Sequence, residues 1–130
     1  MNHYVKIIDE AESHAQTVIN CFKKKKFDNK FLLGLATISF EKFMVGFLMS
    51  KGKTPNGHTL SYLVKEMSNY MDIPESGIRL LQELDNKIQL CSLQSVKTYI
   101  PNDTVMRSII NTLVFFQDII RNEVPPGNNL

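Results

Sequence analysis

A short loop rich in glycine and lysine offers the first candidate for binding chemistry. It reads G-K-T-P-N-G-H over residues 52–58, directly after Lys51. If a helix begins just beyond it, the free backbone N–H groups there carry partial positive charge and can hold a phosphate. Lys51, Lys53 and His58 would add charged donors to such a site. The same residues also fit a plain turn in which His58 packs or caps, so the sequence leaves both interpretations open.

A second group of candidates is the run Lys23, Lys24, Lys25 and Lys26. Residues 23–53 hold eight lysines against two carboxylates, whereas the rest of the chain is acidic and the net charge is only +2. Such asymmetry can steer a polyanion towards one end of a protein. Lysines also suit the end of a helix, where they oppose its negative dipole. The run therefore predicts either one anion-binding surface shared with Lys51, Lys53 and His58, or a solvated rim.

Motifs for catalysis and metal binding are largely missing from the sequence. Glu10-x-x-x-His14 lacks the second half that a di-iron bundle needs. The tripeptide G-K-T at 52–54 ends like a phosphate loop, but the glycine required five residues earlier is Phe47. Three histidines without a nucleophile elbow give no catalytic triad. We therefore predict no metal site and no cofactor.

Length and composition indicate one globular domain. The chain has 130 residues, of which 43% are hydrophobic and 22% are charged. No apolar run approaches the roughly 20 residues of a membrane span, and acidic residues stand where a signal peptide would be apolar. Cys21 and Cys91 lie far apart in apolar patterns and are expected to be buried free thiols. We expect a cytoplasmic protein with no membrane segment.

Helical periodicity extends over nearly the whole chain. Apolar residues recur at intervals of three and four, and no bounded alternating strand or repeat is found. Gly52 suits the left-handed residue that ends a helix, and Thr59 or Asn56 can cap the next one. We predict an all-α, antiparallel up-and-down bundle of four to five helices over residues 1–122, followed by a disordered tail at 123–130. The helices are expected at about 4–22, 29–50, 60–71, 75–97 and 103–122.

Phenylalanines are concentrated in the second and fifth predicted helices. This set offers more apolar surface than one small bundle obviously needs, so it predicts either core packing or a surface for dimerisation. Its members are Phe31, Phe40, Phe43, Phe47, Phe115 and Phe116.

Several of these features occur in an order typical of a known family. An acidic first helix precedes a central helix rich in Ala and aromatic residues and the turn G-K-T-P-N-G-H-T-L-S-Y-L. The segment L-D-N-K-I-Q-L-C-S-L, the loop Y-I-P-N-D and a closing helix follow. This arrangement resembles the HEPN domain over nearly the whole chain. The resemblance implies a helical bundle that dimerises and acts with a nucleotide, RNA or a minimal nucleotidyltransferase.

RNA-cleaving members of that family carry an arginine, a polar residue and, several positions later, a histidine. Arg121-Asn122 matches only the start of this pattern, because all three histidines precede the first arginine, Arg79. The resemblance places a histidine at the turn, which His58 matches. In the RNA-cleaving members that histidine would carry the proton, and this chain lacks it. The resemblance therefore implies a non-catalytic binding or accessory module that acts as a homodimer. The alternatives are an endoribonuclease with a divergent site, in which Arg121 holds phosphate, and a purely structural dimer.

Overall fold

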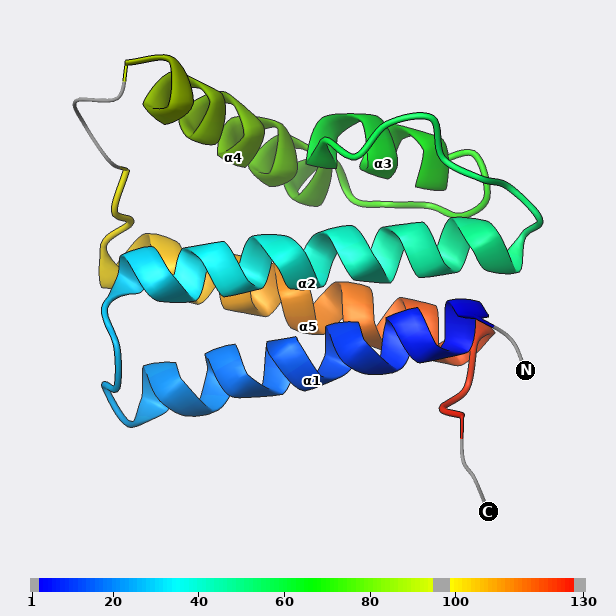
Figure 1. Ribbon diagram of the computed structural model, residues 1–130, viewed down its shortest axis with the longest axis horizontal. Coiled ribbons are helices and arrows are strands. Elements are labelled where there is room, and N and C mark those ends of the chain that lie inside the picture. The colour runs from blue at the N-terminus through cyan, green and yellow to red at the C-terminus, as the bar shows by residue number, and fades with distance from the viewer. Residues whose placement is uncertain (1–2, 95–98, 128–130) are drawn as a thin grey trace.

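The residues that the structure describes form five α-helices, and the predicted all-α bundle is confirmed. The computed structural model describes residues 3–94 and 99–127 (Figure 1). No β-strand occurs within those two ranges. The helices are α1 (His3–Lys23), α2 (Asn29–Ser50), α3 (Leu60–Met67), α4 (Glu75–Gln94) and α5 (Asp103–Glu123).

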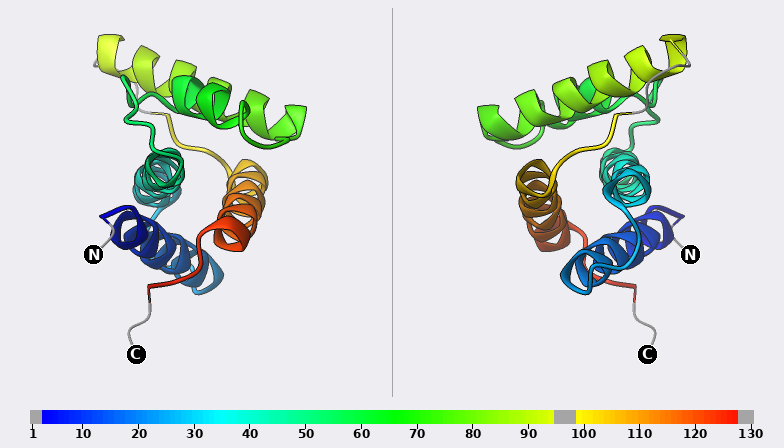
Figure 2. Two further views of the ribbon diagram at one scale, coloured as in Figure 1. Left: turned by 90° about the vertical axis from the view of Figure 1, so that its right-hand side faces the viewer. Right: turned by 90° about the vertical axis from the view of Figure 1, so that its left-hand side faces the viewer.

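The helices are arranged in two layers around α2. Helices α1, α2 and α5 contact one another, and α1 runs opposite to both α2 and α5 (Figure 1). Helices α3 and α4 contact each other and lie across the same side of this group, where α3 packs on α2 (Figure 2). Helix α2 therefore touches α1, α3 and α5, which explains why it is apolar around most of its circumference.

Three helix starts are fixed by capping side chains. Asp28 accepts a hydrogen bond from the Phe31 N–H at the start of α2, and Asn102 accepts one from the Val105 N–H in α5. Thr59, rather than Asn56, caps α3. Gly52 has a φ of 78°, the left-handed conformation predicted for it after α2.

Most of the phenylalanine set belongs to the core. Phe40, Phe43, Phe47 and Phe116 are fully buried, and the Phe40 and Phe116 rings meet edge to face with centroids 5.6 Å apart. Phe31 differs, because 48% of it is exposed. Core packing is therefore confirmed for the four buried rings.

Helix α2 is long and apolar enough to meet the length and hydropathy criteria for a membrane span, contrary to the expectation from the sequence. Its apolar window has a mean hydropathy of 1.6, and 56% of that window is buried within the bundle. Glu41 and Lys42 interrupt the apolar residues, but the mean hydropathy of the window still meets the criterion for a membrane span. The core helix of a bundle has the same properties.

Three details of the sequence prediction are wrong. Helix α3 ends at Met67, because the Ser68 hydroxyl bonds back to the Lys65 carbonyl and residues 68–70 form a turn, which leaves Met71 outside the helix. The predicted tail includes Glu123, the last residue of α5, and Val124, which packs into the core. Cys21 is half-buried rather than buried. The side chain of Cys91 lies outside the described residues.

Close packing of α1 on α2 predicts opposite effects for the same substitution at two glycines. An added Cβ at Gly46 would lie 2.5 Å from Ile8 Cγ1, whereas at Gly34 nothing lies within 4 Å. We expect Gly46→Ala to destabilise the fold by about 1 to 2 kcal/mol, because overpacking outweighs the helix propensity of alanine. Gly34→Ala should stabilise it by up to about 1 kcal/mol. Urea unfolding of dilute protein measures both changes, and shifts of equal sign would contradict this packing.

Candidate functional site

The three predicted anion-binding residues after α2 are each paired with a carboxylate. Lys51 Nζ lies 2.9 Å from Glu123 Oε1, and Lys53 Nζ lies 2.7 Å from Glu66 Oε1. The interaction with the Glu66 carboxylate raises the pKa of Lys53 above its ordinary value. His58 Nδ1 lies 2.9 Å from Glu41 Oε2. These pairs fasten the loop to α2, α3 and α5, so the interpretation as a turn fits better than an anion site.

The N-terminus of α3 is not open to a phosphate either. The backbone N–H groups of Leu60 and Ser61 donate to the two carboxylate oxygens of Asp85 on α4, at 3.1 and 2.6 Å. The Tyr62 N–H donates to the Thr59 hydroxyl. A carboxylate from the protein thus occupies the position that a bound phosphate would take.

The lysine run lies at the other end of the molecule, so the predicted shared surface is wrong. Lys26 precedes α2 and Lys51 follows it. The 22 residues of α2 separate the two groups. At 1.5 Å per residue, that helix is about 33 Å long.

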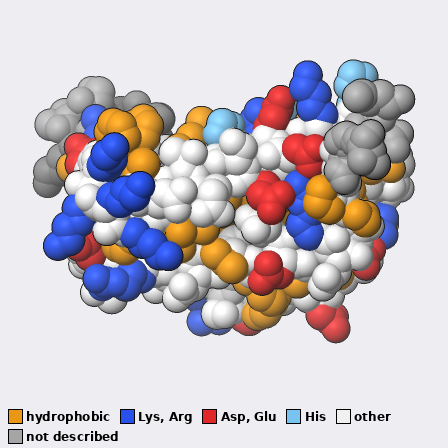
Figure 3. All heavy atoms as spheres, turned by 90° about the horizontal axis from the view of Figure 1, so that it is seen from below, with side chains coloured by type: hydrophobic (Ala, Val, Ile, Leu, Met, Phe, Trp, Pro, Cys, Tyr) orange, Lys and Arg blue, Asp and Glu red, His pale blue; other side chains and the backbone are white. Residues whose placement is uncertain are grey.

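Lys23, Lys24, Lys25 and Lys26 are exposed, and no ion pair to another described residue involves them. The end of the bundle that they occupy also holds Lys30 and Arg107, which are exposed as well. Lys and Arg side chains gather there in the space-filling view, at the left of Figure 3, whereas acidic side chains are more frequent on the other half. We call Lys23–Lys26, Lys30 and Arg107 the basic end.

The loop that joins α1 to α2 has an unusual backbone. Lys25 and Phe27 have φ values of 53° and 66°, and they are the non-glycine residues with positive φ in the described chain. Bulky residues rarely adopt this conformation, and the strain is often found at functional sites. Phe27 is also 63% exposed, and its ring lies 4.7 Å from that of Phe31. The loop therefore presents an aromatic surface among lysines.

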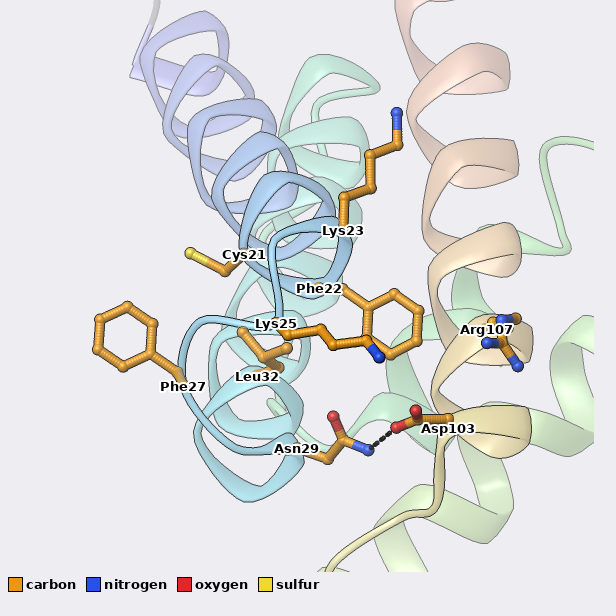
Figure 4. A pocket seen from close by; sticks show the side chains of 9 residues that line it. All are labelled: Cys21, Phe22, Lys23, Lys25, Phe27, Asn29, Leu32, Asp103 and Arg107. Carbon is orange, nitrogen blue, oxygen red and sulfur yellow. Dashed lines mark hydrogen bonds between the residues drawn. The ribbon is translucent and has the colours of Figure 1, made fainter.

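A hollow of about 380 Å³ lies within the basic end, between the end of α1 and the start of α5. Phe22 points across it towards α5, where the Arg107 guanidinium lies 5.7 Å from the ring centroid (Figure 4). Lys25 extends beside Phe22 (Figure 4). Asn29 Nδ2 donates to Asp103 Oδ1 at 2.9 Å at the base of the hollow and ties α2 to α5. The volume lies within the range of about 300 to 1,000 Å³ found for small-molecule pockets.

Arg121, the candidate phosphate ligand of a divergent ribonuclease, joins α5 to α1 instead. Its Nη2 lies 2.6 Å from Asp9 Oδ1, and its Nε donates to Glu12 Oε1 at 3.0 Å. The side chain is only 13% exposed. Burial opposes its charge, but the hydrogen bonds to Asp9 and Glu12 outweigh burial and raise the pKa of Arg121. Asn122 is exposed beside it, and this guanidinium is not free to bind phosphate.

The Glu10–His14 pair gives no metal centre. Glu10 Oε1 instead accepts a hydrogen bond from Lys42 Nζ at 2.8 Å, and that bond lowers the pKa of Glu10. Its stabilising effect is therefore present above the ordinary pKa of 4.5 and lost as the pH falls through the lowered pKa. Within the part of the chain that the structure describes, no group of three His, Cys, Asp or Glu side chains could hold a metal ion.

Phe27, Asn29, Asp103 and Arg107 were not predicted as site residues from the sequence. Phe27 directly follows the lysine run and Asn29 comes two residues later, so the run is the one local signal that could have indicated them. Asp103 and Arg107 are more than seventy positions further on and join the site only through the packing of α5.

No protein-family model matches the chain, and no curated protein sequence matches it. One solved structure is similar, the crystal structure of TT1696 from Thermus thermophilus. The match has a TM-score of 0.75 and 13% sequence identity, and it covers 95% of this chain and all of that one. At this identity the likeness concerns the helical fold alone.

Proposed function

We propose that the protein is a HEPN-like module that binds single-stranded RNA at its basic end. The observation that carries the proposal is the contrast between two groups of cations. Lys51, Lys53 and His58 are held by carboxylates, whereas the lysines of residues 23–26 face solvent without an ion pair among the described residues.

Single strands fit this surface better than duplexes. Unpaired ammonium groups bind backbone phosphates and release their counterions. The exposed ring of Phe27 offers a stacking surface, which only an unstacked base can use. Lysines and an aromatic ring on one loop can therefore hold successive phosphates together with a base between them.

Titration of a labelled RNA of about 12 nucleotides, followed by fluorescence anisotropy, tests the proposal. With about four phosphate contacts, the affinity should fall roughly 50-fold between about 50 and 200 mM salt. Absence of binding, or an affinity that does not change with salt, would contradict it.

The ribonuclease alternative loses its one named residue, because Arg121 is committed to Asp9 and Glu12. These contacts favour RNA binding in which Arg121 does not hold phosphate. The nucleotidyltransferase subunit stays a prediction that rests on the family resemblance.

We propose that the RNA-binding form is a homodimer joined through the outer side of α2. Phe31 and Ile38 are 48% and 45% exposed, and they lie seven residues apart on one side of the helix. Gly34 lies between them and leaves open space for close approach. Phe31 and Ile38 lie equally far from the midpoint between positions 34 and 35. A two-fold axis at that midpoint would place Phe31 of each copy against Ile38 of the other copy.

Substitution Ile38→Lys should convert this dimer to a monomer at micromolar concentration, because a charge would be buried within the interface. Sedimentation velocity measures the change. Gln82→Lys on the exposed side of α4 adds the same charge away from α2 and should leave the dimer intact. A wild-type protein that is monomeric at these concentrations would refute the dimer.

A further inference from the structure

We infer that the hollow in the basic end is selective for guanine, presented either by a free nucleotide or by an unpaired guanosine in RNA. The inference deepens the proposed function and depends on it. Its basis is the hydrogen-bonding character of Asn29 and Asp103, which face the hollow from two different helices (Figure 4).

The orientation of the Asn29 amide is fixed by two acceptors. Nδ2 donates to the Pro101 carbonyl and to Asp103 Oδ1, each at 2.9 Å, so both of its hydrogens are used. The remaining polar atom, Asn29 Oδ1, can only accept. Asp103 Oδ2 is likewise an acceptor, and neither oxygen has a hydrogen-bond partner among the described residues.

Two neighbouring acceptors require a ligand edge with two neighbouring donors. Guanine has this edge, because its N1–H and N2 amino group are adjacent. Adenine and cytosine each place a ring acceptor beside the amino group, and uracil places its single N–H between two carbonyl groups. A site built from acceptors disfavours those bases, because each acceptor of the site would face another acceptor of the base instead of a donor.

The charges around the hollow favour a nucleotide over a simple cation. Lys23, Lys25 and Arg107 line it and outnumber its one carboxylate, Asp103, so the net positive charge disfavours a cation and can hold a phosphate. The guanidinium of Arg107 and the ring of Phe22 supply flat surfaces for the base. The ligand must therefore carry an anionic group and a donor edge together.

Competition by mononucleotides against the labelled RNA tests the inference on the intact protein. We expect GMP to compete roughly tenfold or more better than AMP and UMP, with IMP, which lacks the N2 amino group, between them. In RNA, an oligouridine with one central guanosine should bind more tightly than its inosine or adenosine counterparts. These two arms separate a nucleotide site from a site for guanosine within RNA.

Asp103→Asn replaces the acceptor by a donor in a side chain of the same shape, so the preference for GMP should disappear while RNA still binds. Asp118→Asn removes the same charge from an exposed position of α5 and should keep the preference. Equal competition by all four nucleotides, alongside salt-dependent RNA binding, would overturn the guanine inference and leave the proposed function standing. Failure to bind any RNA would overturn both.

Discussion

Substitution of Lys23, Lys25 and Lys26 by glutamine is expected to weaken binding of single-stranded RNA by about two orders of magnitude at roughly 50 mM salt. These ammonium groups are exposed and have no ion pair among the described residues, so each can contact a phosphate directly. The variant should also lose most of its salt dependence, because fewer counterions are released on binding. Anisotropy titrations at two salt concentrations measure both effects.

The matched control removes three positive charges from the opposite end of the molecule. Lys6→Gln, Lys51→Gln and Lys53→Gln together should change RNA affinity less than about threefold, because Lys51 and Lys53 are paired with Glu123 and Glu66. If this variant weakens binding as much as the first, net charge rather than the basic end determines RNA binding.

Substitution Arg121→Met is expected to destabilise the fold by about 2 to 3 kcal/mol. The guanidinium holds Asp9 and Glu12 of α1 against α5, and its removal leaves two neighbouring carboxylates without a counter-charge. The loss should stay below that of a fully buried ion pair, because both carboxylates are more than one third exposed. Urea unfolding measures this change in free energy.

Arg79→Met is the control for Arg121→Met. Arg79 lies 3.8 Å from Glu75 within α4, and both side chains are mostly exposed. Its removal should change stability by less than about 0.5 kcal/mol.

At a temperature where the Arg121→Met variant is folded, the RNA affinity of that variant should equal that of the wild type. A marked loss of affinity would restore Arg121 as a phosphate ligand.

The bundle could be predicted because the sequence signals that define each helix lie within that helix or next to it. Apolar spacing marks each helix, and Asp28, Thr59 and Asn102 fix three of the helix starts through hydrogen bonds within one turn. The last residue of a helix could not be predicted where no glycine or proline marks the end, as after Met67.

The site could be predicted only in part, because ion pairs between distant residues decide which lysines are free. Lys25 and Lys53 are the same residue type in similar polar loops. Only the packing of α3 shows that Glu66 neutralises Lys53. The pairing of Arg121 with Asp9 spans 112 positions, and that of Asn29 with Asp103 spans 74. Neither leaves a pattern in a single sequence.

The assignment of RNA binding to the basic end is tested most directly by backbone amide chemical shifts recorded during titration with single-stranded RNA. Binding at the basic end should perturb the amides of residues 21–32 and 103–107 and leave those of residues 51–62 unchanged. Perturbations centred on residues 51–62, or none at saturating RNA, would contradict it.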